Sequence, residues 1–400
     1  MKKMECDVVI AGCGVAGLFS ALHLPKNQKI IMLSKEDFDS CDSMLAQGGI
    51  CVLLNDDDYD DYFEDTMRAG HYENRIESVD LMLRESRSVI NELLECGVRF
   101  EKKEDGSLAY TKEGAHSRPR ICFHKDITGK EITTALQRKV RELPNVTMME
   151  YTTMTDVMIK HEGTPNQYCH GIKAIAKDGE DIEIYASDVI MATGGIGGLY
   201  EHSTNFPCLT GDACRISKEH GVVLEHMDYV QIHPTCLYSK NKGRSFLISE
   251  SARGEGAILL NHKGERFVDE LLPRDVVTAA IHAEMEKENV PYEYLSFEHV
   301  DKEEILSHFP NIYQKCLDEG YDILKEPVPV VPAQHYFMGG VYVNQDSQTT
   351  MPHLYAVGET SCNGVHGKNR LASNSLLESL VFAKQAAAKI KETSDKTKSA

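Results

Sequence analysis

Apolar positions along this chain gather in short runs separated by more polar segments, and the first runs set the pattern. Residues 6–11 form a short apolar stretch typical of a β-strand, and residues 18–22 read as a helix. A second strand-like run follows at 29–33. Strand, helix and strand in this order form a βαβ unit, which requires a parallel sheet with right-handed connections. We therefore predict an α/β protein built on a Rossmann-like sheet.

Two later stretches with apolar residues at helical spacing, 76–96 and 129–143, predict surface helices. Asp126 and Thr128 stand at the start of the second one and are candidate caps, because their side-chain oxygens can accept hydrogen bonds from free helix amides. The segment after Ser373 predicts a third, longer helix that dissolves into a tail of Lys, Ser and Thr residues.

Alternating and continuous apolar patterns predict further strands. Residues 146–159 and 167–184 alternate between apolar and polar positions, which predicts a small antiparallel meander beside the main sheet. Residues 188–195 read as a buried strand ending in Thr-Gly-Gly, and 354–359 as a strand that ends at a glycine. Glycines at such strand ends let the backbone approach a ligand closely.

The pattern changes between residues 221 and 333 to short, mixed strands and helices, and the Pro-rich segment 327–332 predicts a linker back to the first domain. The length of 400 residues also exceeds that of one compact core. We expect a discontinuous cofactor-binding domain, residues 1–220 and 334–400, with an α+β capping domain, residues 221–333, inserted in it.

Composition excludes several classes of function. No stretch approaches about 18 apolar residues, and the chain starts with a strand, so we expect neither a membrane span nor a secretory signal. The 12 cysteines contain no C-x-x-C pair, which argues against zinc, iron–sulfur or disulfide chemistry and favours reduced thiols in the cytoplasm. The net charge of −19 disfavours nucleic acid as a partner. The acidic run 55–61 lacks the glycine and terminal glutamate of a calcium loop, so we predict no metal site.

Two glycine-rich elements point to a dinucleotide. Gly12, Gly14 and Gly17 form a G-x-G-x-x-G motif between strand and helix, where they permit a tight turn, close approach to a pyrophosphate and close helix packing. The pyrophosphate would lie at the helix N-terminus. Residues 42–49, Asp-Ser-Met-Leu-Ala-Gln-Gly-Gly, supply a second set of small residues and backbone amides. Together the two elements indicate a flavin rather than a nicotinamide cofactor.

Further motifs follow in order along the chain: Glu113–Ser117, Asp126–Gly129, Ala192–Gly195, Gln231–Thr235, Ser249–Gly256, Arg274–Asp275, His335–Tyr336, Gly339–Gly340, Gly358–Glu359 and His366–Leu376. With the two glycine-rich elements, they resemble the flavoprotein family of succinate dehydrogenase, fumarate reductase and L-aspartate oxidase. Within this family the L-aspartate oxidases are the most similar group. The resemblance spans the chain almost from end to end.

The resemblance implies non-covalently bound FAD and oxidation of L-aspartate to iminoaspartate, with dioxygen (forming H2O2) or fumarate as the electron acceptor. This reaction is the first step of NAD biosynthesis toward quinolinate, and it implies a cytoplasmic protein with a functional link to quinolinate synthase. Many L-aspartate oxidases carry a further C-terminal helical domain. We expect this chain to lack it, either as a short natural form or as a truncated one. The alternative is a flavoprotein subunit of a fumarate reductase or succinate dehydrogenase, which works beside an iron–sulfur partner.

The resemblance also implies the residues of the site. The catalytic residues would be Arg274, His233, His335 and Glu250. The substrate would contact Glu113, Arg370, Ser249, Gln231 and His366. The FAD would contact Gly12, Cys13, Gly14, Val15, Ala16, Gly17, Ser34, Lys35, Asp42, Ser43, Met44, Leu45, Ala46, Gln47, Gly48, Gly49, Thr153, Met154, Thr193, Gly194, Asp212, Glu359, Asn374, Ser375 and Leu376.

Arginine side chains suit a dicarboxylate substrate, because the planar guanidinium binds both oxygens of a carboxylate. In the family pattern Arg274 also moves a proton. A free arginine has a pKa above about 12, so this role needs a relay through Glu250 or Asp275. The alternative for Arg274 and Asp275 is a structural salt bridge at a helix start.

Two acidic residues distinguish the functions within the family. A carboxylate at Glu113 would attract the ammonium group of aspartate, which succinate lacks; the alternative is a solvated acid in a loop. Asp42 stands where the membrane-complex enzymes carry the histidine that binds FAD covalently. We therefore expect FAD to be bound without a covalent bond.

Overall fold

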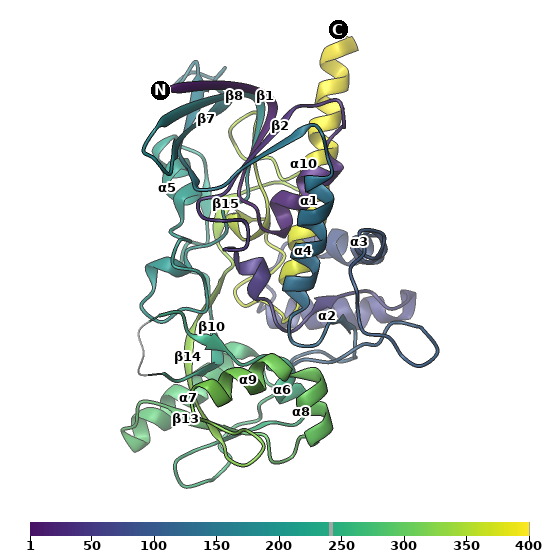
Figure 1. Ribbon diagram of the computed structural model, residues 1–400, viewed down its shortest axis with the longest axis vertical. Coiled ribbons are helices and arrows are strands. Elements are labelled where there is room, and N and C mark those ends of the chain that lie inside the picture. Colours follow the sequence, from purple (N-terminus) through teal and green to yellow (C-terminus); the bar gives the residue numbers. More distant parts are fainter. Residues whose placement is uncertain (240–242, 400) are drawn as a thin grey trace.

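The computed structural model describes residues 1–239 and 243–399. Residues 240–242 and 400, which belong to the predicted capping and cofactor domains, lie outside the described residues. The molecule is elongated, with both termini near one end and the elements of residues 230–337 near the other (Figure 1). Within the described ranges, no helix combines the length and the apolar character needed to cross a membrane.

A seven-stranded sheet forms the end that carries the termini. Its strand order is β5-β2-β1-β8-β7-β6, and β16 also pairs with β8. Strands β5, β2, β1, β8 and β16 run parallel, so the α/β prediction is confirmed. The bounds are β1 Lys2–Ala11, β2 Ile30–Leu33, β5 Val146–Met149, β6 Thr152–Lys160, β7 Tyr168–Ala176, β8 Asp181–Met191 and β16 Leu354–Ala356.

Alternate side chains of the central strands enter two different cores, which explains their continuous apolar runs. Val8 and Ile10 of β1 pack on one face of the sheet with α1, whereas Val9 and Ala11 pack on the other. Parallel strands covered on both faces have this unbroken apolar pattern.

The predicted meander is wrong in one respect, because it is not a separate sheet. Its last strand and the buried strand predicted at 188–195 are one element, β8, which ends at Met191 and pairs antiparallel with β7 and parallel with β1. Its first predicted strand is two elements: β5 lies at the parallel edge, and β6 at the antiparallel edge. Alternation of apolar and polar residues shows that the two faces of a strand differ in environment, but it does not show which other strands pair with it.

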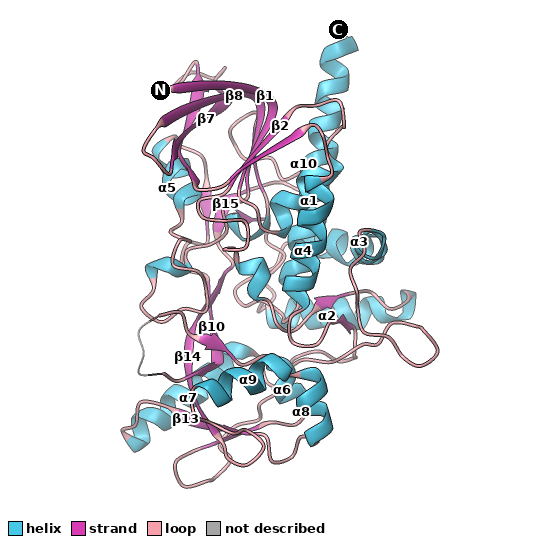
Figure 2. Ribbon diagram, viewed as in Figure 1, coloured by secondary structure: helices cyan, strands magenta, loops and turns pink. Residues whose placement is uncertain are grey.

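Helices lie beside this sheet (Figure 2), and six of them are described in this part of the molecule. They are α1 Val15–His23, α2 Tyr59–Ala69, α3 Ile76–Glu95, α4 Thr128–Arg141, α5 Asp212–Glu219 and α10 Asn374–Ser399. The predicted caps of α4 are wrong: Ile127 is the N-cap residue, and no side chain caps it. Asp126 instead accepts hydrogen bonds from Asn311 and from the backbone of Ile312, which ties α4 to the other end of the molecule.

A five-stranded antiparallel sheet, in the order β11-β10-β14-β13-β12, forms the other end. Its bounds are β10 Val230–Leu237, β11 Phe246–Leu247, β12 Ile258–Leu260, β13 Glu293–Ser296 and β14 Val328–Phe337. The helices α6 Glu250–Gly254, α7 Arg274–Glu288, α8 Lys302–His308 and α9 Pro310–Asp318 accompany it. This end has a hydrophobic core of its own.

The Pro-rich segment 327–332 is not a linker; it lies largely within β14, a central strand of this sheet. Proline cannot donate to the hydrogen-bond ladder, so it is tolerated where pairing is interrupted. Pro332 lies at such a point, because the pairing of β10 and β14 shifts register between His233 and Cys236. Pro234 lies in the same β-bulge.

Short elements join the two ends. Strands β3 Ile50–Cys51 and β4 Ile121–Cys122 pair with each other, and β9 Leu224–Glu225, β15 Gly340–Tyr342 and β17 Ser361–Cys362 form a three-stranded sheet. Four 3-10 turns complete the described elements: η1 Asp42–Leu45, η2 Asp56–Asp58, η3 Gly197–Leu199 and η4 Gly358–Thr360.

Candidate active site

One end of the main cavity is built from glycine backbone at the turn between β1 and α1. Gly12 has a φ of +120°, and a Cβ atom there would come 1.9 Å from the carbonyl oxygen of Ala192. A Cβ atom on Gly17 would come 2.2 Å from the carbonyl oxygen of Gly12. Helix α1 begins at Val15, and its N-cap, Gly14, has no side chain to occupy the helix amides. This end of the cavity is therefore shaped for a closely approaching anion.

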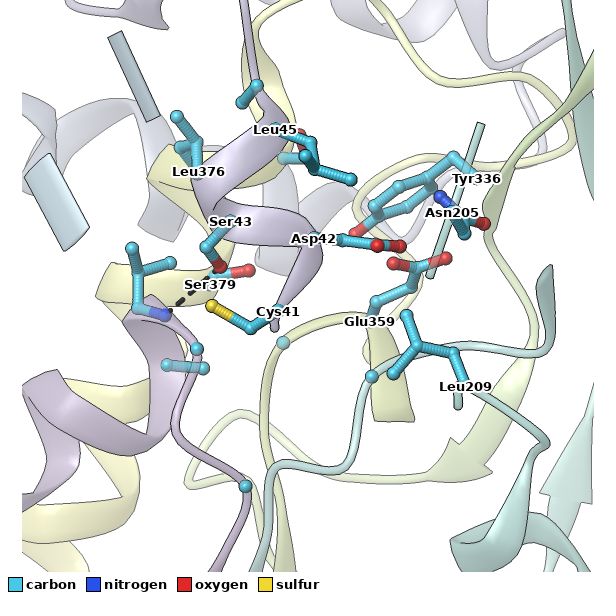
Figure 3. A pocket seen from close by; sticks show the side chains of 18 of the residues that line it. Cys41, Asp42, Ser43, Leu45, Asn205, Leu209, Tyr336, Glu359, Leu376 and Ser379 are labelled. Atoms are coloured by element: carbon cyan, nitrogen blue, oxygen red, sulfur yellow. Dashed lines mark hydrogen bonds between the residues drawn. The ribbon is translucent and has the colours of Figure 1, made fainter. Parts of the chain in front are cut away.

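The second glycine-rich element lies against the first. The hydroxyl of Ser43, in η1, accepts a hydrogen bond from the backbone amide of Val15 at 3.1 Å (Figure 3). A Cβ atom on Gly14 would lie 3.0 Å from this hydroxyl oxygen. The two motifs thus form one continuous surface of backbone and small side chains.

The cavity gathers most of the residues that the resemblance implies. The predicted FAD residues that line it are Gly12, Cys13, Gly14, Val15, Ala16, Ser34, Lys35, Asp42, Ser43, Leu45, Ala46, Gln47, Gly48, Gly49, Thr153, Met154, Thr193, Gly194, Asp212, Glu359, Ser375 and Leu376. The predicted catalytic and substrate residues that line it are His233, Ser249, Glu250, Arg274, His335, Glu113 and Arg370.

Five predicted residues lie behind the lining in the described structure. Gly17 packs against the β1 turn, Met44 is the one residue of η1 that turns away from the cavity, and Asn374 is fully buried at the start of α10. Gln231 and His366 are buried behind residues that do line the cavity. These side chains support the surface rather than form it.

Gln231 holds two arginines in place. Its Oε1 atom accepts hydrogen bonds from Arg274 Nη1 at 2.9 Å and from Arg370 Nε at 3.2 Å. Its Nε2 atom donates to Asn369 Oδ1 and to the carbonyl oxygen of Arg370, both at 2.8 Å, which fixes the orientation of the amide. The guanidinium of Arg370 also lies 4.4 Å from the centre of the Tyr336 ring.

Arg370 has no carboxylate within salt-bridge distance among the described residues. Burial, and then the positive charge of Arg274, lower the pKa of Arg370 to about 10. The guanidinium therefore stays protonated at neutral pH while its charge is unfavourable in the free protein. A bound carboxylate would relieve this cost.

Arg274 pairs with Glu250 and not with Asp275. Its Nε atom donates to Glu250 Oε2 at 2.5 Å, and Arg253 Nη2 lies 3.5 Å from the same oxygen. Burial alone would raise the pKa of Glu250, but Arg274 and Arg253 lower it below its usual value. Asp275 pairs with His71 instead, at 2.9 Å and largely in solvent. The predicted relay through Asp275 and the salt bridge at the helix start are therefore both wrong.

His233 and His335 meet at bulges of the paired strands β10 and β14, with ring centres 5.1 Å apart. Bulges re-aim side chains in this way. The amide of Thr235 donates to His233 Nδ1 at 3.2 Å, so Nε2 carries the proton, and Nε2 is buried with no hydrogen-bond partner among the described residues. His335 Nδ1 lies 2.7 Å from the Thr204 hydroxyl. Burial first, and then Arg274, lower the pKa of both histidines well below the usual value, so both are neutral.

Glu113 is a buried carboxyl group, not a solvated loop acid. The Ser251 hydroxyl donates to its Oε1 atom at 2.9 Å, and the Ser373 hydroxyl donates to Oε2. The hydroxyl of Ser249 in turn donates to Ser251 Oγ at 3.1 Å. Burial, and then the charge of Glu250, raise the pKa of Glu113.

Several lining residues were missed by sequence reasoning. Ser373 lies inside a matched motif, and Tyr336 follows His335 directly, so both were within reach of the motif argument. Arg244 lies in no motif. It lines the cavity and donates from Nη1 to the Thr204 carbonyl oxygen at 3.1 Å. Only the folded chain shows that this arginine faces the site.

Comparisons with known proteins show the family of the chain. The chain matches a family model described as an FAD binding domain over residues 7–376. It is 50% identical to an L-aspartate oxidase of Clostridium perfringens over 389 residues, covering 97% of this chain and 87% of that protein. An L-aspartate oxidase of Clostridium acetobutylicum is 47% identical, with 97% and 88% covered.

The fold is also similar to solved structures. A mutant of the quinol fumarate reductase of E. coli superimposes with a TM-score of 0.92 at 30% identity, covering 99% of this chain and 71% of that one. The structural similarity therefore reaches the fumarate reductases, whereas the higher sequence identities are to L-aspartate oxidases. The chain belongs to the L-aspartate oxidase family of FAD-dependent flavoproteins.

Proposed function

We propose that this protein oxidises L-aspartate to iminoaspartate and passes the electrons to fumarate or dioxygen, as the first step of NAD biosynthesis toward quinolinate. The observation that carries the proposal is a pair of buried arginines, Arg274 and Arg370, joined by Gln231 and facing the same cavity as the buried carboxyl of Glu113. Two cations and one acidic group match the two carboxylates and the ammonium group of aspartate.

The cavity fits FAD. A Cβ atom at Gly12 would clash with the backbone of Ala192, so the turn between β1 and α1 presents bare backbone to the cavity, and the start of α1, whose N-cap residue Gly14 has no side chain, suits a pyrophosphate. The two glycine-rich elements would hold the dinucleotide. Lys35, whose Nζ atom donates to Asp212 at 2.8 Å, lines the cavity with them. FAD, when bound, supplies hydride acceptance, and the chain supplies orientation and charge.

The arginine pair would bind and orient the substrate. Gln231 ties both guanidinium groups to one amide, so the two carboxylates of aspartate would be held in fixed relation to each other. His233 adds an Nε2–H donor that has no partner in the described part of the chain, and because its pKa is strongly lowered it donates without adding charge. Fumarate, which also carries two carboxylates, would use the same clamp.

A chain of charged side chains would move the proton. Arg274 faces the cavity, and its Nε atom contacts Glu250, which is anionic and contacts Arg253. A free arginine is a poor base because it is already protonated at neutral pH. Arg274 could still accept a proton from the substrate if it passed one of its own protons to Glu250 at the same time, and the short contact between the two side chains allows this transfer. His335 would complete the polar wall beside this chain.

Glu113 would select the amino acid over the plain dicarboxylate. The serines that hold it, Ser251 and Ser373, fix its orientation in the cavity wall. An anionic Glu113 attracts an ammonium group, whereas with succinate it would face only a CH2 group. This preference, together with Asp42 at the tether position, argues against the alternative of a fumarate reductase or succinate dehydrogenase subunit.

Several wider proposals follow from family membership. We propose that residues 1–220 and 334–400 act as the FAD-binding domain and that residues 221–333 act as the cap that closes the substrate end. We also propose dioxygen as an acceptor, a functional link to quinolinate synthase and a cytoplasmic location.

The test is an anaerobic titration of the flavin absorbance. L-Aspartate should bleach the oxidised flavin, and succinate at the same concentration should not. Bleaching by succinate alone would contradict the proposal and favour the succinate dehydrogenase alternative. Acid denaturation of the same sample should release all of the flavin as FAD, and flavin left on the polypeptide would overturn the non-covalent assignment.

A further inference from the structure

Two acidic side chains from distant parts of the sequence face each other in the cofactor cavity. Asp42 begins η1, and Glu359 lies in η4. Their carboxyl groups point toward one another, with Tyr336 beside them (Figure 3). Both residues line the cavity at its FAD-binding side.

The protein supplies few hydrogen bonds to this pair. Asp42 Oδ1 accepts from the amide of Phe206 at 2.9 Å, and Glu359 Oε1 accepts from the amide of Phe337 at 2.9 Å. Asp42 Oδ2 is buried and has no partner among the described residues. One backbone donor each is little for two carboxylates, and two like charges in one site disfavour each other. A single proton between the two oxygens would remove the repulsion and satisfy the lone oxygen.

The surroundings do not neutralise both charges. Arg244 acts on Asp42, and Arg370 acts on Glu359, while Glu378 adds a further negative charge near Glu359. Among the described residues, the remaining titratable groups that face the pair are Cys41, Cys208 and Tyr336. Burial raises the pKa of Asp42 to about 7, and burial, followed by the charge of Asp42, raises the pKa of Glu359 to about 8.

We propose that Asp42 and Glu359 share one proton and that this protonated pair is the form that binds FAD. Bound FAD would displace water from the pair, and its pyrophosphate adds negative charge to the same cavity. Both effects disfavour the doubly ionised pair and raise its pKa further. FAD binding is then coupled to the uptake of a proton.

The sign of the pH dependence follows from this coupling. If FAD binding raises the pKa of the carboxyl pair, the proton on the pair strengthens FAD binding. This contribution to the affinity is complete at a pH below the pKa of the free protein, and it is lost as the pH rises through the pKa of the FAD-bound protein. Between the two pKa values the affinity falls by about tenfold per pH unit for one proton. We therefore expect FAD to be held tightly near pH 6 and to dissociate more readily as the pH rises above about 7 to 8.

The inference rests on the FAD cofactor and not on the choice of substrate. Its test measures the FAD released when the holoenzyme is diluted between pH 6 and 9, followed by the fluorescence of free FAD. No turnover is involved, so a failure of the aspartate oxidase proposal would leave this test unchanged.

The wild-type protein should release FAD with a dissociation constant that rises at least tenfold over this range. Asp42→Asn and Glu359→Gln replace one acid with a neutral group of the same shape, so each should retain FAD with little pH dependence. Glu359→Asp keeps two carboxyl groups and should keep the pH dependence. Glu293→Gln is the matched control, because it neutralises a buried carboxyl of raised pKa in β13, outside the cavity lining; it should behave as the wild type does.

Three results would overturn the proposal. The first is FAD release from the wild type that does not change with pH. The second is an unchanged pH dependence in both Asp42→Asn and Glu359→Gln. The third is complete loss of FAD from these two variants at every pH, because a neutral amide imitates the protonated partner that the proposal requires.

Discussion

The two ends of the cavity are built in opposite ways. The phosphate end consists of backbone and small residues from two short segments, 12–17 and 42–49, and it works by the absence of side chains. The substrate end consists of polar and charged side chains from β10, α6, α7 and the segment 366–376, which lie far apart in the sequence. The first end tolerates almost no added atom. The second depends on the mutual support of its side chains.

The largest expected effect comes from an added methyl group at the phosphate end. Gly12→Ala would place a Cβ atom 1.9 Å from the Ala192 carbonyl oxygen, and backbone cannot yield as a flexible side chain can. We expect protein without flavin, measured as the ratio of flavin to protein absorbance. Gly106→Ala is the matched control, since Gly106 has a φ of +82° and open space around it. It should cost about 1–2 kcal/mol of stability for the left-handed backbone and keep its FAD. A full complement of FAD in Gly12→Ala would contradict the steric account.

The next effect tests the proton path at the substrate end. Arg274→Leu should lower kcat for L-aspartate by about 10²–10⁴-fold, the usual contribution of a group that transfers a proton. Arg274→Lys keeps the charge but loses the planar fork that contacts both Glu250 and Gln231, so it should also lose kcat. Arg99→Leu removes an exposed arginine that is paired with Glu131 and serves as the control. If Arg274→Lys keeps the wild-type kcat, Arg274 contributes only its positive charge and does not transfer the proton.

The smallest of the three effects separates the two substrates. Glu113→Gln should lower kcat/KM for L-aspartate by about ten- to a hundredfold, which corresponds to the loss of a charge-assisted contact of about 1.5–3 kcal/mol. Fumarate reduction by the same variant should change much less, because fumarate carries no ammonium group. Steady-state kinetics with both substrates provide the measurement. An equal loss on both would mean that Glu113 only supports the wall that Ser251 and Ser373 share.

The contrast between the ends explains what the sequence could predict. The phosphate end could be recognised because a few glycines close together in the sequence determine its backbone geometry. The sheet could be recognised because its strands are continuously apolar. The motif match also located Arg274, Arg370 and the two histidines. It could not show that one amide, that of Gln231, is hydrogen-bonded to both arginines, because this contact depends on how distant segments fold together.

Other errors have the same origin. Pro-rich composition predicted a linker at 327–332, but a strand tolerates proline where a bulge interrupts its pairing, and the bulge belongs to the partner strand β10. Arg244 enters the cavity from a segment without any motif. Local sequence describes what a residue prefers, whereas these outcomes depend on which segment folds beside it.

Strands β10 and β14 have a mechanical consequence as well. Both belong to the second sheet: the chain enters that sheet through β10 and leaves it through β14, and the two strands are hydrogen-bonded to each other (Figure 1). A two-stranded ribbon bends out of its plane more easily than its strands slide past each other. His233 and His335 are carried on the ribbon itself. A tilt of the second sheet would therefore change where the two imidazoles point, while the hydrogen-bond register keeps their separation.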